Sequence, residues 1–363
     1  MHKGRGRTNR LWGKSMKEDK VVTIEDIAKK AGVGRGTVDR VIHNRGRVSG
    51  KSRQKVLDAI DELGYKPNMS ARMLARKGDY RIAAVFYNTE VEFWAQIRQG
   101  IDDAAERYAP FGMKVDFYIQ PGIDEEGQAR IVREVTEAGY DGIAIVPCFS
   151  DEVGEALDEA VKKGVEVVTF NNRAGRCGCR YVGQDARQSG RTAGGLLCLL
   201  GKKGCRYAIL SASSMAMNHL DDRCNGFLDV VRERRMDMRF AGIHYLMEND
   251  NDDSAYQSAK KLLEKYSDRW DALYVTTAYT GSVARAMEDL GIKKDIFFIG
   301  HDLTKTNRHY LKEGFIDILI GQNPEYQGYT AVEAICRKLL GGEELSKDEH
   351  TEISIITADN MDG

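Results

Sequence analysis

Residues 22–78 decide how the chain is organised, and they read VTIEDIAKKAGVGRGTVDRVIHNRGRVSGKSRQKVLDAIDELGYKPNMSARMLARKG. Apolar residues recur in this stretch at helical spacing, which predicts three helices of about 8, 9 and 14 residues. Thr23 and Asp26 resemble the capping box at the start of the first helix, and Gly32 ends it. The second helix covers about 35–43 and follows a short turn, which is typical of a helix-turn-helix unit.

Basic residues surround the second and third predicted helices. Arg35 and Arg40 lie on the expected exposed side of the second helix, where a recognition helix presents side chains to the major groove. More basic residues flank the start of the third helix, where the phosphates of a bound duplex would run. We expect Ser49 to cap this helix. Its apolar stripe is expected to contain Val56, Leu57, Ile60 and Leu63.

The charge of the chain is divided unevenly. Residues 1–78 hold 20 Lys and Arg against 8 Asp and Glu, whereas the remaining residues hold 34 against 47. The formal net charge of -1 therefore hides a basic block joined to an acidic body. Such a block is the electrostatic signature of a nucleic-acid-binding module, although a solvated basic tail would carry similar charge. Residues 1–20 show no apolar periodicity, so we expect them to be a disordered extension.

Residues 22–78 resemble, without a gap, the DNA-binding headpiece of the LacI/GalR (lactose/galactose repressor) family. The resemblance implies that some side chains read base edges and that others contact phosphates or line the groove. The implied base-reading positions are Arg35, Gly36 and Arg40, and the other expected DNA contacts are Thr23, Thr37, Arg47 and Ser49.

Two positions depart from the family pattern. Gly36 lacks the side chain that usually reads a base, so specificity should rest more on Arg35 and Arg40, whose guanidinium groups suit guanine. Asp39 stands where the family usually carries serine. A carboxylate beside DNA is repulsive unless it accepts from cytosine or pairs with a cation, and we favour pairing with Arg35 or Arg40.

Residues 67–78 are similar to the hinge helix and linker of the same family. A helix this short is marginal by itself, and in the family it folds only when two copies meet on the minor groove. A paired leucine then wedges into the central base step and kinks the duplex, and by position this residue is Leu74. The resemblance therefore implies a homodimer on a roughly palindromic, double-stranded DNA operator.

From residue 79 onward the chain alternates short β-rich runs with amphipathic helices. Nearly continuous apolar strands between helices indicate parallel sheets covered on both faces. The series is too long for one compact sheet, so we predict an α/β body of two doubly wound lobes, with a ligand cleft at the carboxyl ends of their strands. The expected strands are 82–87, 114–120, 142–148, 166–170, 207–212, 240–246, 272–277, 296–302 and 315–322, and the expected helices are 93–108, 124–138, 151–163, 186–201, 219–234, 253–266, 281–290, 304–313 and 325–340.

These patterns predict the domain boundaries. The headpiece and the body are expected to fold as separate units joined by the hinge. The expected parts are a disordered basic extension (1–20), an all-α helix-turn-helix headpiece (21–66), a hinge helix and linker (67–78) and an effector-binding domain (79–363). Within that domain we expect the first lobe to comprise about 79–184 and 322–342, and the second about 185–321 and 343–363.

The body also resembles the effector domain of the LacI/GalR family and, more widely, the ribose-type periplasmic sugar-binding proteins. In such folds the ligand is gripped by polar and aromatic residues that follow the strands. An aromatic pair would stack on a sugar ring, and an arginine would donate to sugar oxygens. A carboxylate would accept from sugar hydroxyl groups, and amides would both donate and accept. The expected ligand is a neutral sugar, a sugar acid or a cyclitol. The expected ligand contacts are Phe93, Trp94, Asn171, Asn172, Arg223, Tyr279, Asp302 and Gln322.

Structural roles would also explain several of these residues. The aromatic pair could pack a helix against the sheet. Arg223 could form a surface ion pair with Asp221, and Asp302 could cap the helix that starts near Thr304. Tyr279 could equally have a structural role.

Other classes of protein lack support in the sequence. No apolar run reaches the roughly 18 residues that span a bilayer, and no secretory signal is evident, so we expect a cytoplasmic protein. Seven cysteines without paired spacing fit reduced thiols, and we interpret Cys177 and Cys179 as a loop thiol pair rather than a zinc or redox site. No nucleophile elbow, P-loop or metal-spaced histidine pair occurs, so we expect no catalytic residue, metal or cofactor.

The sequence therefore predicts a cytoplasmic, dimeric, ligand-responsive transcription regulator, most simply a repressor that a sugar-like effector releases. The first alternative is a corepressor-type regulator that binds a purine or another metabolite. The others are an enzyme acting on a sugar, for which only Asp302 offers an acid/base group, and a transport-type binding protein, for which a signal peptide is missing.

Overall fold

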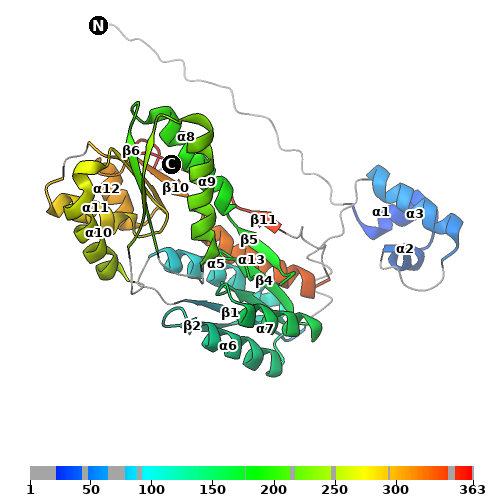
Figure 1. Ribbon diagram of the computed structural model, residues 1–363. Helices are drawn as coiled ribbons and strands as arrows, with labels where there is room; N and C mark the ends of the chain where they lie inside the picture. The colour runs from blue at the N-terminus through cyan, green and yellow to red at the C-terminus, as the bar shows by residue number, and fades with distance from the viewer. Residues whose placement is uncertain are drawn as a thin grey trace, which may run out of the picture. The chain divides into compact units, whose positions relative to one another are not determined.

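The computed structural model describes residues 22–42, 48–63, 78–87, 92–175, 177–212, 217–246, 251–292, 295–341 and 348–361. They fall into two compact units, which divide the chain into residues 1–72 and 73–363 (Figure 1). Among the described residues, no helix is both long and apolar enough to cross a membrane.

The small unit is the three-helix bundle that the sequence predicts. The first helix starts with a capping box, in which the Thr23 amide donates to the Asp26 carboxylate at 2.9 Å and the Asp26 amide donates to the Thr23 hydroxyl at 3.3 Å. Gly32 ends the helix with a φ of 64°, a left-handed conformation that favours glycine. The helices are α1 (Ile24–Ala31), α2 (Arg35–Ile42) and α3 (Gly50–Leu63).

The core of this unit brings together apolar side chains from all three helices. One prediction about it was wrong, because Leu57 is 43% exposed and Ala59 takes the inward position instead. Residues 56, 59, 60 and 63 follow the three- and four-residue spacing of one helical face, and residue 57 lies beside that face. The buried side chains are Ile27, Ala28, Ala31, Val38, Val41, Val56 and Ala59.

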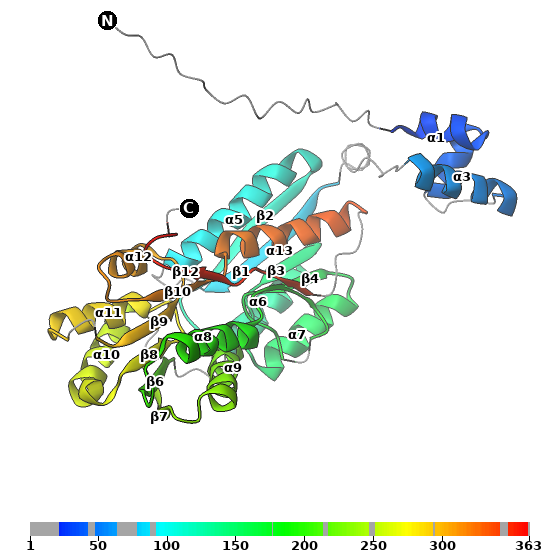
Figure 2. The same ribbon diagram turned by 90° about the horizontal axis from the view of Figure 1, so that it is seen from above.

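The large unit consists of two α/β lobes, each built on a six-stranded sheet, which confirms the predicted doubly wound architecture (Figure 2). Neighbouring strands pair in parallel, except that the edge strand β12 (Ser354–Ile356) runs antiparallel to β10 (Ile318–Gly321). The first sheet has the order β11 (Asp348–His350), β5 (Arg180–Gly183), β4 (Glu166–Phe170), β3 (Gly142–Ile145), β1 (Tyr80–Tyr87) and β2 (Met113–Gln120). The second has the order β12, β10, β9 (Phe297–His301), β8 (Ala272–Val275), β6 (Arg206–Ser211) and β7 (Arg239–Tyr245).

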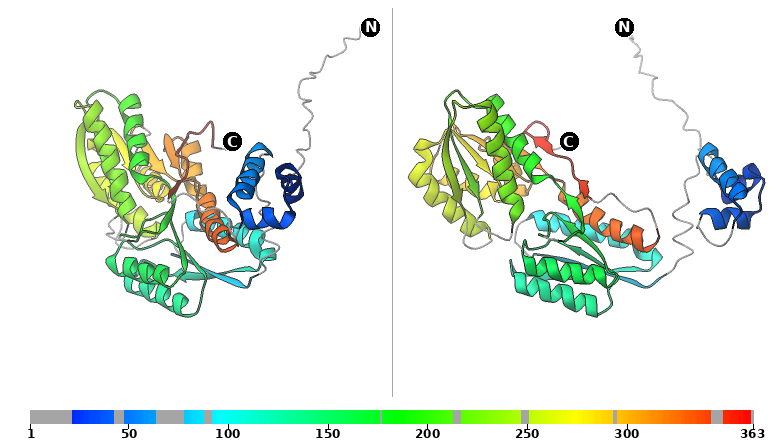
Figure 3. Two further views of the ribbon diagram at one scale, coloured as in Figure 1. Left: turned by 90° about the vertical axis from the view of Figure 1, so that its right-hand side faces the viewer. Right: turned by 45° about the vertical axis from the view of Figure 1, so that its right-hand side comes forward.

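Helices cover both faces of each sheet (Figure 2 and Figure 3). In the first lobe, the helices α5 and α13 pack so closely that a Cβ atom at Gly100 would collide with the Glu325 carbonyl oxygen. In the second lobe, separate apolar clusters lie on the two faces of the sheet. The helices are α5 (Glu92–Tyr108), α6 (Glu125–Glu137), α7 (Asp151–Lys162), α8 (Ala186–Leu200), α9 (Asn218–Arg234), α10 (Asp252–Tyr266), α11 (Thr280–Asp289), α12 (Lys305–Lys312) and α13 (Pro324–Leu339).

The chain crosses between the sheets in places that the sequence did not fully predict. It passes from β5 into α8, from β10 into α13, and from β11 into β12. We expected 343–363 to belong wholly to the second lobe, but β11 pairs with β5 of the first sheet. The strands β5, β11 and β12 were missed because three or four residues are too few to show an alternating pattern.

The loop between β4 and β5 carries a disulfide between Cys177 and Cys179, where we expected two free thiols. The two Cα atoms lie 5.2 Å apart, within the usual range for a disulfide. Cysteines with free thiols lie elsewhere in the body, and burial raises the pKa of Cys224 to about 11.

Candidate functional site

The outward face of α2 carries the residues that the sequence predicts to read DNA. Arg35, Gly36 and Arg40 are exposed and Thr37 is half-buried, whereas Val38 is buried in the core. The burial of the valine fixes which face of the helix points outward. The structure therefore brings the three predicted base-reading positions together on one surface.

The Arg40 side chain lies over Gly36 on the same helix. The Arg40 Nε atom donates to the Gly36 carbonyl oxygen at 2.9 Å, so the guanidinium group folds back over the glycine. A Cβ atom at residue 36 would lie 3.7 Å from an Arg40 terminal nitrogen, which is an ordinary van der Waals contact, so this position of Arg40 does not require the glycine. Arg40 can thus offer its terminal nitrogens to a guanine edge from a position held by its own helix.

Thr23 and Ser49 have capping roles in the structure. The Thr23 hydroxyl donates to Asp26 at 2.7 Å, and the Ser49 hydroxyl accepts from the Ser52 amide at 3.2 Å. Both residues are exposed at helix starts, and their contact with DNA stays a prediction, as does the pairing of Asp39 with an arginine. Arg47 and Leu74 lie outside the described residues.

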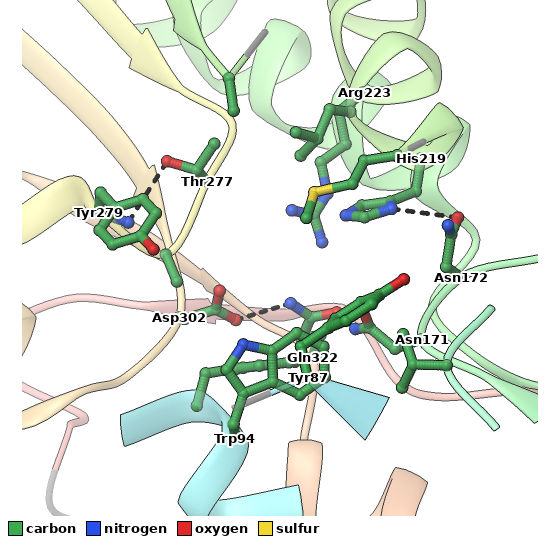
Figure 4. Close-up of a pocket in the computed structure, with 16 residues that line it drawn as sticks. Tyr87, Trp94, Asn171, Asn172, His219, Arg223, Thr277, Tyr279, Asp302 and Gln322 are labelled. Atoms are coloured by element: carbon green, nitrogen blue, oxygen red, sulfur yellow. Dashed lines mark hydrogen bonds between the residues drawn. The ribbon is translucent and has the colours of Figure 1, made fainter. Parts of the chain in front are cut away.

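In the large unit, all eight predicted ligand contacts line one cavity between the two lobes (Figure 4). It encloses about 620 Å³, part of which is open to solvent. The predicted residues meet there because most of them follow the carboxyl ends of parallel strands. Sequence reasoning missed the other lining residues, which are Tyr87, Val146, Ala212, Met217, His219, Leu220, Thr277 and Ala278.

An aromatic cluster forms one wall of this cavity. The Trp94 ring meets Tyr87 edge-on at 5.5 Å and Phe93 edge-on at 5.2 Å, and it stacks with Phe86 at 6.3 Å. Phe93 is only 4% exposed, so packing accounts for most of its surface, as the structural alternative supposed. Trp94 is half-buried and retains an exposed aromatic surface for a ligand.

Amide side chains form a hydrogen-bonded network along another wall. Gln322 Nε2 donates to the Asp302 carboxylate at 2.8 Å, and Asn171 Nδ2 donates to Gln322 Oε1 at 3.4 Å. Gln327 Nε2 donates to the Gln322 carbonyl oxygen at 2.9 Å and holds it in place. Asn171 and Asp302 have φ angles of 60° and 68°, a strained conformation that often occurs at functional sites.

Asp302 does not cap the helix that follows it. Thr304 takes that role, because its hydroxyl accepts from the Asn307 amide at 3.2 Å at the start of α12. The Asp302 carboxylate is therefore left facing the cavity. Its burial raises its pKa, while the Arg223 charge and the Gln322 hydrogen bond oppose that shift.

Arg223 supplies a buried positive charge. It is 3% exposed, and its Nη1 atom donates to the Thr276 carbonyl oxygen at 2.6 Å. Its Nε atom has no hydrogen-bond partner among the described residues, and no ion pair within 4.0 Å joins it there to Asp302 or Asp221. The cavity thus holds a cationic donor and a carboxylate that do not neutralise each other by direct contact.

His219 links the two lobes at the edge of the cavity. Its Nδ1 atom lies 3.2 Å from Asn172 Oδ1, and Asn172 Nδ2 donates to the Pro147 carbonyl oxygen at 2.9 Å. Burial and the Arg223 charge lower the pKa of His219 to about 3, so its ring is neutral at physiological pH. Because His219 precedes Arg223 by four residues on α9, helical spacing could have predicted it.

Tyr279 lies just before α11 and lines the cavity. It is 6% exposed, and its amide donates to the Thr277 hydroxyl at 3.3 Å. The structure therefore places Tyr279 in the same cavity as the other predicted ligand contacts. Among the described residues, no group of three His, Cys, Asp or Glu side chains is arranged to hold a metal ion.

Comparison with known proteins gives two family matches. Residues 82–344 match the periplasmic binding protein domain, and residues 23–68 match the lacI family of bacterial regulatory proteins. Catabolite control protein A of Priestia megaterium is 27% identical over 289 residues, which cover 78% of this chain and 83% of that protein. The transcriptional regulator MalR of Clostridium butyricum is 25% identical over 80% of this chain and 85% of its own length.

Solved structures show the same fold in the body. GanP of Geobacillus stearothermophilus, titled a glucose-galactose binding protein, has a TM-score of 0.69 and 25% identity, covering 78% of this chain and 99% of its own. A LacI regulator structure from Bacteroides fragilis has a TM-score of 0.69 and 20% identity, with the same coverage. The curated relatives named here are regulators rather than enzymes. With a lacI-type headpiece joined to a periplasmic-binding-protein body, this chain belongs to the LacI/GalR family of DNA-binding transcriptional regulators.

Proposed function

We propose that this protein is a cytoplasmic repressor that binds operator DNA as a homodimer and is released by a sugar-like effector held between the two lobes. One observation carries the effector assignment. The Arg223 guanidinium and the Asp302 carboxylate are both buried, both line the same cavity and are not paired with each other. The hydroxyl groups of a polyol can accept hydrogen bonds from the guanidinium group and donate hydrogen bonds to the carboxylate without adding charge.

Two further observations support a sugar as the effector. The exposed surface of Trp94 suits the apolar face of a sugar ring, and the network around Gln322 offers both donors and acceptors. Among the relatives, one at 26% identity over 60% of this chain is named a ribose operon repressor. GanP, which shares the fold of the body, is named for glucose and galactose binding.

The cavity provides a route from effector to DNA. Trp94 and Asn171 reach it from the first lobe, whereas Arg223 and Asp302 reach it from the second. An effector that contacts both lobes stabilises the arrangement in which they approach each other. We propose that this arrangement alters the spacing of the two hinge segments of a dimer, with a coupling free energy of about 1–3 kcal/mol.

On the DNA side, we propose that Arg35 and Arg40 contact guanines and that Thr23, Thr37, Arg47 and Ser49 contact phosphates or the groove. The exposure of Arg35 and Arg40 on one face of α2 supports the first part. The kinking role of Leu74 rests on the family resemblance alone.

A ligand screen tests the effector assignment. We expect at least one compound from a panel of neutral sugars, sugar acids and cyclitols to raise the melting temperature of the protein and to weaken its binding to operator DNA. Arg223→Ala should abolish the shift, whereas Arg232→Ala, which alters an exposed arginine on the same helix, should retain it. If only purines raise the melting temperature, the effector is a corepressor-type ligand and the sugar assignment is wrong. A flat response to the whole panel would refute the proposal.

A further inference from the structure

A second cavity lies next to the first. It encloses about 570 Å³, part of which is open to solvent, and Asn171, Asn172 and His219 line both cavities. The contact between His219 Nδ1 and Asn172 Oδ1 at 3.2 Å belongs to the shared wall. The two cavities are therefore adjacent compartments between the same two lobes.

The second cavity contains hydrogen-bond acceptors that the protein does not use. Gln184 is 3% exposed, and its Nε2 atom donates to the Gly321 carbonyl oxygen, but within the described residues its Oε1 atom has no partner. The buried Oδ1 atom of Asn218 likewise has no partner in the part of the chain that the structure describes. Buried acceptors without partners cost stability, so they are expected to serve a ligand or ordered water.

Two carboxylates lie beside these acceptors. Asp185 caps α8 by accepting from the Gln188 amide at 2.8 Å, which leaves its second oxygen available. Asp222 forms no hydrogen bond or ion pair with the described residues, and partial burial raises its pKa. Both side chains line the cavity, so hydroxyl donors are favoured there.

The cations of the second cavity are already paired. Arg173 forms an ion pair with Asp348 at 3.2 Å and lies over the Tyr181 ring at 4.0 Å. Arg187 forms an ion pair with Asp229. A phosphate would therefore meet unpaired carboxylates rather than unpaired cations, which disfavours an anionic ligand.

We propose that the second cavity holds the second ring of an oligosaccharide whose first ring lies against Trp94 in the first cavity. This inference rests on the proposed function, because it assumes a sugar in the first cavity. It assigns the effector to the class of neutral disaccharides or longer oligosaccharides. The unpartnered oxygens near Gln184 and Asp222 accept hydrogen bonds from the hydroxyl groups of the second ring.

Calorimetric titration of the full-length protein tests this assignment. The probes are the monosaccharides glucose and galactose, the disaccharides maltose, cellobiose and melibiose, and glucose 6-phosphate. We expect at least one disaccharide to bind about tenfold or more tightly than its component monosaccharides, because a hydrogen bond to a charged group contributes that much. Asp222→Asn should remove most of this gain. Asp221→Asn, which alters the neighbouring exposed carboxylate outside both cavities, should not.

The possible outcomes separate this inference from the proposed function. Monosaccharide binding without any gain for a disaccharide would overturn the inference and leave the proposed function intact. An equal loss of monosaccharide and disaccharide affinity in Asp222→Asn would also overturn it, as would tighter binding of glucose 6-phosphate than of glucose. If none of these saccharides binds but a sugar acid or a cyclitol from the ligand screen does, this inference fails and the proposed function stands. If the whole ligand screen is also flat, both fail.

Discussion

At the scale of single residues, Asp302 illustrates a conflict between binding and stability. Its carboxylate is buried and lines the cavity, and burial raises its pKa above the ordinary value of 3.8. Folding therefore becomes less favourable as the pH rises through the pKa of the folded state, because the buried group must then ionise. A buried carboxyl group that lowers folding stability in this way is expected where it binds a ligand.

Asp302→Asn should separate the two effects. The variant should bind the effector at least about tenfold more weakly, because it loses a charged acceptor. It should also melt at a higher temperature at pH 7, and this gain should shrink as the pH falls toward and below 3.8, where the carboxyl group becomes protonated in both the folded and the unfolded state. Scanning calorimetry across this pH range measures the melting temperatures of the two proteins, and titration calorimetry measures their affinities for the effector. Asparagine tolerates the left-handed backbone at this position, so a lower melting temperature at pH 7 would contradict the argument.

At the scale of secondary-structure elements, a contact between α5 and α12 joins the two lobes. Glu92 begins α5, and its carboxylate accepts from the Lys305 amide at 2.6 Å at the start of α12. The Lys305 ammonium group lies 3.9 Å from the same carboxylate but is 89% exposed, so this ion pair contributes little. The helix start is the more important partner, because its amides favour a negative charge.

We expect Glu92→Ala to weaken effector binding by about two- to fivefold, because a carboxylate at a helix start contributes about 0.3–1 kcal/mol. The substitution should weaken the contact between the two lobes and leave the residues that line the cavity unchanged. The relative affinities for different sugars should therefore stay the same. Glu106→Ala, on the exposed side of α5, is the matched control. Selective loss of one sugar, or equal loss in the control, would show that Glu92 has another role.

The elements also show what the sequence could predict. Most of the eight expected ligand residues could be placed at one cavity because strand ends can be located from apolar runs, and parallel strands deliver their ends to one place. Arg223 lies within α9, and its placement came from the family resemblance. His219 was missed because the four-residue spacing that puts it on the same face of α9 as Arg223 was not used to search for further ligand contacts. The strand β11 was missed because its stability comes from pairing with β5, a partner distant in sequence. Leu57 was wrongly assigned to the core because its apolar side chain suggested burial, whereas the inward position belongs to the smaller Ala59.

At the scale of the whole molecule, the salt dependence of DNA binding reports how many chains bind. The logarithm of the association constant should fall with the logarithm of salt concentration by about 0.9 per phosphate contact. Lys51 is exposed at the start of α3, where we expect a phosphate. Lys51→Ala should reduce the slope by about 1.8 if two chains bind, because each contributes one contact. A reduction of about 0.9 would indicate a single chain, and Gln54→Ala on the same helix should leave the slope unchanged.

The three passages of the chain between the sheets, after β5, after β10 and between β11 and β12, have a mechanical consequence. Neither half of the body is a continuous piece of sequence, so neither can be excised from the gene as an autonomous fragment. A protease that severs one passage leaves two others intact, and the nicked halves stay attached. Three crossover segments also restrain sliding and twisting of one lobe against the other. We therefore expect hinge opening and closure to be the main motion of the body.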